Sequence, residues 1–244
     1  MYFLFLLMSL IPAIPILIWV HRCKESPTRD RKTAWHMILW VLLGIVVCTL
    51  IAEIPIEPPL SLDYIGENLV YGIFCVGVPE EATKLGAVLL ATRLLPGFWK
   101  SPHLIPCVLF TCTVFAVIEN ALYMMEADMA TAIMRSVTAV FAHTTYGLLA
   151  ILLILALQGR SKWLIAIGLV FGGSIHGMDN FILFNLNLLP EEHPFPLLFI
   201  FVVWPAIVVV NILIIVRMTK IYRISISGQD TGQSPTIMGG GLQP

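Results

Sequence analysis

Three charged residues lie inside one long apolar stretch of the sequence. Glu80, Glu81 and Lys84 interrupt a run that is otherwise hydrophobic from about residue 69 to residue 95, apart from Arg93 near its end, which we assign to the following basic loop. A charge at the centre of a lipid bilayer costs roughly 2.5–3.5 kcal/mol on insertion scales, and charges at that depth usually serve a function. Glu80 and Lys84 are four residues apart on one helix face, so we expect an ion pair between them. Glu81 is rotated by about 100° and is expected to face another partner.

Further acids and histidines occur in three later apolar stretches. Phe115, Glu119 and Tyr123 repeat every four residues, which places a carboxylate in the middle of one helix stripe. His143 lies in the next stretch and His176 in the one after it.

Four other polar residues accompany these groups and are expected to support them. We expect Asn120 and Tyr123 to form hydrogen bonds between helices. Arg135 either reaches the membrane interface or pairs with a carboxylate. Asp179 follows His176 by three residues, so the two are neighbours on one helix face.

This set of residues is suited to the hydrolysis of a peptide bond inside a membrane. A glutamate can activate a water molecule, while His143, with Asn120 or His176, donates hydrogen bonds to the developing oxyanion. Alternatively, a divalent metal such as zinc could activate the water, held by Glu81, Glu119, His143 and His176. The sequence has no HExxH motif, so the usual zincin arrangement is absent. Both mechanisms remain open from the residues alone.

The composition indicates that membrane-spanning helices must position these residues. Of the 244 residues, 58% are hydrophobic and only 12% are charged, whereas charge makes up about a quarter of a typical soluble domain. The apolar residues form runs of about 20, the length that an α-helix needs to cross a bilayer. We therefore predict an all-α polytopic membrane bundle with spans at about residues 2–20, 34–52, 68–95, 103–125, 132–157, 163–184 and 197–216.

The charges outside the spans predict the orientation of the chain. Twelve of the fourteen Lys and Arg residues lie in alternate loops or after the last span, and only Lys84 and Arg135 do not. The remaining loops are acidic. Because positive loops stay on the cytoplasmic side, we expect the N-terminus outside and the C-terminus in the cytoplasm.

The predicted topology brings the acids and histidines to similar depths. Glu80 and His143 lie about 12 residues, roughly 18 Å, from the outer ends of their spans. Glu119 and His176 lie about 6 to 9 residues, roughly 9–14 Å, from theirs. We therefore expect one layer of functional groups in the outer half or near the middle of the membrane. Glycines at 147, 172, 173 and 177 would let these helices approach closely.

The remaining features predict domain organisation and partners. Residues 1–224 form one integral membrane domain with a motif-bearing core at 68–185, and residues 225–244, rich in Gly, Ser, Gln and Pro, are expected to form a disordered cytoplasmic tail. The five cysteines are expected to be free thiols. A net charge of −1 argues against nucleic-acid binding. The expected partners are the lipid bilayer and a membrane-anchored protein substrate, and no particular oligomeric state is indicated.

Four ordered motifs between Glu80 and Phe181 resemble those of the PrsW-type intramembrane proteases, relatives of the CAAX prenyl endopeptidase and bacteriocin-processing families. They are Glu80-Glu81-x-x-Lys84, Phe115-x-x-x-Glu119-Asn120-x-x-Tyr123, Arg135 followed by His143-x-x-x-Gly147, and His176-Gly-x-x-Asp179.

The resemblance implies a multi-span protease that cuts membrane-anchored substrates, as in the first cleavage of an anti-sigma factor on its extracytoplasmic side. It implies a location in the bacterial cytoplasmic membrane. Glu80 and Glu81 would be the central catalytic acids, and Glu119, His143 and His176 would complete the site. Because the family has been described both as metalloproteases and as glutamate proteases, the resemblance leaves the metal open.

Two other classes of function compete with a protease. A non-catalytic scaffold, like the gamma-secretase scaffold subunit, would keep the fold without chemistry, but it would not need both acids and both histidines. A proton- or cation-coupled transporter also uses Glu, His and Asp within spans. The chain shows no inverted repeat in its hydropathy, which argues against a transporter.

Overall fold

The computed structural model describes residues 2–23, 26–53, 65–94, 101–123, 129–156, 162–187, 202 and 204–230. Within these ranges every regular element is helical, in agreement with the predicted all-α class. The long helices are α1 (Tyr2–Arg22), α2 (Arg31–Glu53), α4 (Val78–Leu94), α5 (Ser101–Tyr123), α6 (Met129–Ala156), α7 (Lys162–Asn187) and α9 (Trp204–Asp230), and the short elements are η1 (Pro27–Arg29), α3 (Ile65–Tyr71) and η3 (Gly72–Gly77).

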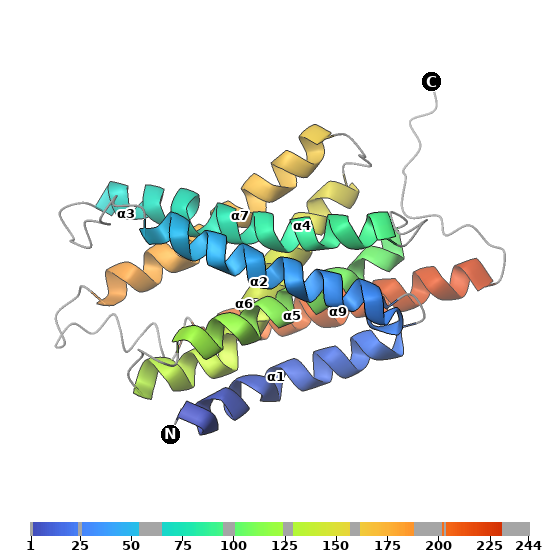
Figure 1. Ribbon diagram of the computed structural model, residues 1–244, viewed down its shortest axis with the longest axis horizontal. Coiled ribbons are helices and arrows are strands. Elements are labelled where there is room, and N and C mark those ends of the chain that lie inside the picture. Colours follow the sequence, from blue (N-terminus) through green and yellow to red (C-terminus); the bar gives the residue numbers. More distant parts are fainter. Residues whose placement is uncertain are drawn as a thin grey trace.

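The helices form a bundle in which α5 is the central member (Figure 1). Helix α5 packs against α1, α2, α4, α6 and α9. Its residues from Leu104 to Phe110 are buried almost completely, together with Val20 of α1 and Leu148 of α6. Burial on all sides explains why α5 is apolar around its whole circumference.

The beginning of α2 is defined by a side-chain cap. The carboxylate of Asp30 accepts hydrogen bonds from the backbone N–H groups of Lys32 and Thr33, each at 3.2 Å, and from the Thr33 hydroxyl. These bonds satisfy donors that the first turn of a helix leaves free. They also lower the pKa of the Asp30 carboxyl, with the Thr33 side-chain bond as the largest cause.

The predicted third span is not one regular α-helix. Residues 72–77 form the π-helical segment η3, which separates α3 from α4. A Cβ built on Gly77 would overlap the backbone of Gly173 and Gly177, and one on Gly177 would overlap Gly72 and Ile73. Glycine at these positions therefore lets η3 and α7 pack backbone against backbone.

Three described helices are long and apolar enough to cross a membrane, within Arg31–Ile51, Leu104–Tyr123 and Ile165–Leu183. Helix α2 also exposes Leu39, Leu43, Val46 and Leu50 to 56–61%. A contiguous exposed apolar face of this kind is suited to contact with lipid. These helices thus have the length and composition of membrane spans, whereas the count of seven spans and their orientation stay predictions.

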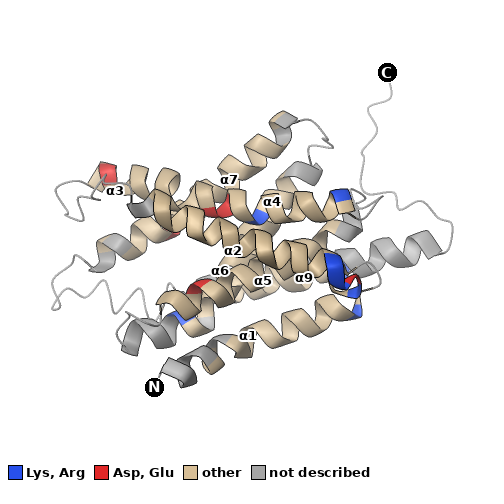
Figure 2. Ribbon diagram, viewed as in Figure 1, with Lys and Arg blue, Asp and Glu red and all other residues tan. Residues whose placement is uncertain are grey.

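Charged residues are distributed unevenly along the bundle (Figure 2). The end of α1, the start of α2 and the end of α4 lie at one end of the bundle (Figure 2). These helix ends carry Arg22, Arg31 and Arg93. Lys84 lies in the interior and is 2% exposed. The orientation of the chain in the membrane stays a prediction.

Two smaller predictions concern the tail and the cysteines. Helix α9 continues to Asp230, so the predicted start of the disordered tail at residue 225 falls inside a helix. The rest of the tail lies outside the described residues. All five cysteines are free, as predicted.

Candidate active site

Four helices bring the predicted acids and histidines into one buried cluster. Helix α4 contributes Glu80 and Glu81 from its first turn, α5 contributes Glu119, α6 contributes His143 and α7 contributes His176. Each of these side chains is at most 9% exposed. Pro79 precedes the two acids and follows η3 without a break, so its missing N–H leaves one helical hydrogen bond unmade at the junction between η3 and α4.

Lys84 is the cation at the centre of this cluster. Its Nζ donates to Glu81 Oε1 at 2.6 Å and lies 3.8 Å from Glu80 Oε2. It also lies 4.4 Å from the centre of the Phe115 ring, a cation–π contact. Lys84 therefore forms two ion pairs, and the expected one with Glu80 is weaker than the one with Glu81. Residues three apart on a helix are neighbours as well, so Lys84 reaches the nearer carboxylate of Glu81.

His176 lies between the two acids of α4. Its Nδ1 is 3.1 Å from Glu81 Oε1, and its Nε2 is 3.6 Å from Glu80 Oε2. The carboxylate of Glu81 can only accept hydrogen bonds, so the proton of a neutral His176 belongs on Nδ1. The Nε2 atom, which faces Glu80, is then left with a free lone pair.

His143 is held by the corresponding contacts on the other side of the cluster. Its Nε2 is 2.7 Å from Glu119 Oε2, and its Nδ1 accepts a hydrogen bond from Lys84 Nζ at 2.8 Å. An ammonium group can only donate, so Nδ1 carries the lone pair and Nε2 the proton. Glu119 is fixed in turn by Arg135, whose Nη2 donates to Glu119 Oε1 at 2.9 Å.

Three of the predicted supporting residues, Arg135, Tyr123 and Asn120, lie on the Glu119 side of the cluster. Arg135 pairs with Glu119 and stacks on Tyr123, with its Cζ 3.9 Å from the ring centre, so it does not simply extend to the membrane interface. Asn120 is fully buried and donates to the backbone carbonyl of Arg135 at 3.2 Å. That bond makes Asn120 a link between α5 and α6 and directs its amide away from the role of oxyanion donor.

Tyr146 is a site residue that sequence reasoning did not single out. Its hydroxyl donates to Asp179 Oδ2 at 2.8 Å, and its ring stacks on His176 with centres 4.8 Å apart. Tyr146 thus links Asp179 to His176, which is also its neighbour three residues earlier on α7. The signal in the sequence was the position of Tyr146, one helical turn after His143.

Three residues of the cluster offer ligand atoms for a metal, although Lys84 holds one of the nitrogens in this structure. Glu80, His143 and His176 offer ligand atoms that all lie within 4.8 Å of one another. Glu80 Oε2 is buried and has no hydrogen-bond partner among the described residues. Each histidine turns one nitrogen to a carboxylate, the usual support of a metal-bound imidazole.

This set differs from the predicted one, which contained Glu81 and Glu119 in place of Glu80. Those two acids contact the outer nitrogens of His176 and His143, so they orient the imidazoles. Only the tertiary structure shows which side of each ring faces which acid.

One carboxylate, two imidazoles and a buried ammonium can also carry out acid–base chemistry without a metal. Glu80 has a free acceptor oxygen for a proton, and Lys84 lies beside it as a positive charge. Glu81 and Glu119 are each held by a cation and an imidazole. They are suited to fixing the geometry, whereas Glu80 lies 3.8 Å from its only cation and its Oε2 makes no hydrogen bond among the described residues.

Comparison with known proteins identifies one family. Residues 32–211 match the model of a family described as PrsW family intramembrane metalloprotease. The matched range contains all the residues of the cluster. Neither the curated proteins nor the solved structures give a match.

Proposed function

Since the chain belongs to the PrsW family of intramembrane metalloproteases, we propose that its protease activity resides in the cluster of Glu80, Glu81, Glu119, His143 and His176. The substrates would be membrane-anchored proteins. The observation that carries this assignment is the buried Oε2 of Glu80, which makes no hydrogen bond among the described residues and lies 3.6 Å from a histidine whose other nitrogen is bound to Glu81. A purely structural cluster would be expected to satisfy that oxygen, because an unpaired buried acceptor is costly.

Glu80 is assigned the role of proton acceptor. It would take a proton from a water molecule while the water oxygen attacks the carbonyl carbon of the substrate. When the C–N bond breaks, Glu80 would return that proton to the leaving amine, so the carboxylate is regenerated. Lys84, 3.8 Å from the same oxygen, is close enough to stabilise the negative charge that develops on the carbonyl oxygen.

Glu80, His143 and His176 would also be the ligands of a divalent metal such as zinc, which when bound supplies a Lewis acid that polarises a carbonyl and acidifies water. In either case Glu81 would orient His176 and Glu119 would orient His143. Loss of Glu80 would therefore abolish hydrolysis with or without a metal. Metal analysis of the purified protein, together with the effect of chelators on cleavage, decides between the metal-dependent and the metal-free mechanism.

The substrates would be single-span proteins cut near the outer half of the membrane. The site lies in the interior of a lipid-exposed bundle, so a substrate must reach it from within the bilayer. The predicted orientation places the cluster toward the extracytoplasmic side. An anti-sigma factor with one span is a suitable substrate to test first.

The experiment compares the membrane proteins of cells that contain the wild-type chain or the Glu80→Gln variant. A protein shortened only by the wild type is then purified, tagged and incorporated with the enzyme into liposomes. Wild type should release one defined fragment, Glu80→Gln none, and Glu67→Gln, an exposed acid of α3, the wild-type amount.

Absence of cleavage by the purified wild-type protein would favour the scaffold alternative. Proton or cation flux into the same liposomes, without cleavage, would favour the transporter.

A further inference from the structure

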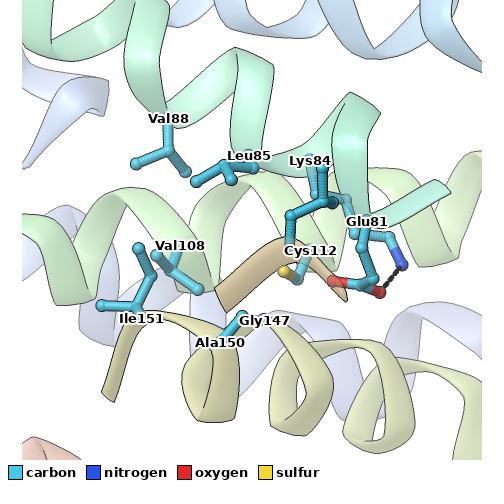
Figure 3. A pocket seen from close by; sticks show the side chains of 10 residues that line it. Glu81, Lys84, Leu85, Val88, Val108, Cys112, Gly147, Ala150 and Ile151 are labelled. Carbon is cyan, nitrogen blue, oxygen red and sulfur yellow. Dashed lines mark hydrogen bonds and ion pairs between the residues drawn. The ribbon is translucent and has the colours of Figure 1, made fainter. Parts of the chain in front are cut away.

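A small cavity begins at the catalytic cluster and extends between α4, α5, α6 and α7 (Figure 3). Its volume is about 20 Å³. One end is formed by Glu81 and Lys84, and the other by aliphatic side chains (Figure 3). The lining residues are Glu81, Lys84, Leu85, Val88, Val108, Cys112, Gly147, Ala150, Ile151 and Leu169.

The chemistry of the walls selects an apolar occupant. The polar atoms at the mouth already bind each other, because Lys84 Nζ donates to Glu81 Oε1 at 2.6 Å. Beyond them the walls are hydrocarbon, with the thiol of Cys112. A water molecule needs two to four polar partners to be stable in a cavity, and apolar cavities of this kind stay dry or take apolar groups.

The size of the cavity selects a small group. Gly147 forms part of its floor, and a Cβ built there would overlap Cys112 Sγ and lie 3.1 Å from Val108 Cγ1. Ala150 backs onto Gly172 of α7, where a Cβ would lie 3.0 Å from the Ala150 methyl group. The floor is therefore held between tightly packed helices and cannot recede to admit an aromatic ring.

We propose that this cavity is a specificity pocket, which binds the small apolar side chain of a substrate residue beside the scissile bond. The proposal rests on the proposed function, since it assumes that peptide bonds are cut at Glu80. Lys84 lines the cavity, and its Nζ lies 3.8 Å from Glu80 Oε2. A side chain in the cavity would therefore hold the adjoining peptide bond near the catalytic carboxylate.

The experiment varies the substrate and the pocket together. The single-span substrate identified above is prepared with Ala, Val, Leu or Phe at each of the two residues that flank the cut bond. At one of the two positions, wild type should cleave the Ala substrate best and the Val substrate less well, with Leu and Phe about ten-fold or more below Ala in kcat/KM.

Two variants should enlarge the pocket and change this preference. Ile151→Ala and Val108→Ala each remove part of the aliphatic end, so relative kcat/KM for Leu or Phe should rise about ten-fold. Val47→Ala removes the same carbons from the exposed face of α2, where Val47 is 45% exposed, and should leave the preference unchanged.

A third variant should make the pocket smaller. Val108→Leu adds one carbon to the wall and should lower cleavage of the Val substrate more than that of the Ala substrate. The ratio between two substrates on one variant is independent of how much of that variant folds.

Unchanged ratios in Ile151→Ala and Val108→Ala, with normal cleavage by wild type, would overturn the specificity pocket while leaving the protease assignment intact. No cleavage of any substrate by wild type would instead overturn the proposed function.

Discussion

Lys84 Nζ lies 2.8 Å from His143 Nδ1, the ring nitrogen that turns away from Glu119 and that a metal at this site would need. The ammonium group of Lys84 therefore occupies the position toward which His143 Nδ1 would direct its lone pair to bind a metal. A metal and the Lys84 side chain cannot both hold that nitrogen. In the absence of a metal, Lys84 is the cation that balances the acids of α4.

Replacing Lys84 should therefore weaken the metal-free protein and strengthen metal binding. Lys84→Met leaves the buried Glu81 carboxylate without its ammonium, which should lower the free energy of unfolding by about 3–5 kcal/mol. The zinc-dependent rise in melting temperature should be larger than in wild type, because no ammonium competes for His143. Thermal unfolding and calorimetric zinc titration measure both effects, with Arg93→Met at the exposed end of α4 as the control. Equal zinc affinity in Lys84→Met and wild type would contradict the competition.

Glu80 and Glu81 should respond differently to the same substitution. Glu80 has an oxygen without a hydrogen bond, so Glu80→Gln should abolish cleavage with a melting temperature close to that of wild type. Glu81 holds Lys84 and His176, so Glu81→Gln should lose cleavage and also about 1–3 kcal/mol of stability. Cleavage assays and thermal unfolding of the two purified variants separate the roles. Full activity in Glu80→Gln would remove it as the proton acceptor.

Tyr146 should act on turnover through His176. Tyr146→Phe keeps the ring that stacks on His176 but loses the bond to Asp179, and Tyr146→Ala loses both. We expect kcat to fall in both variants and further in Tyr146→Ala, with little change in KM. Tyr123→Phe, whose ring contacts Arg135, is the matched control. Equal kcat values in Tyr146→Ala and wild type would show that the stacking does not position His176.

The contact between η3 and α7 should tolerate no side chain. Gly77→Ala would place a methyl group against the backbone of Gly173 and Gly177, and overpacking of this kind costs about 1–3 kcal/mol. Because η3 leads directly into the turn that carries Glu80, cleavage should fall as well. Gly66→Ala is the control, since a Cβ there meets nothing within 4 Å. Comparable melting temperatures for the two variants would show that η3 can move away from α7.

Much of the site follows from the cost of placing polar groups in hydrocarbon. Glu80, Glu119, His143 and His176 are conspicuous because each interrupts an apolar run, and a bilayer leaves such groups no partners except one another. Their depths along the spans were sufficient to predict one shared layer. The class of fold follows from the length of the apolar runs alone.

The partners within that layer depended on the tertiary structure. Whether Lys84 pairs with Glu80 or Glu81, and which nitrogen of His143 faces Glu119, is decided by helix rotations and side-chain torsions that residue spacing leaves free. The π-helical segment at Gly72–Gly77 is another case, because its register is set by contact with glycines about a hundred residues later in the sequence. Sequence by itself determined which chemical groups are buried together. Only the packing of α4 to α7 decided which of them bind each other and which contacts of Glu80 stay longer than a hydrogen bond, because that choice depends on differences of a few ångströms between neighbouring atoms.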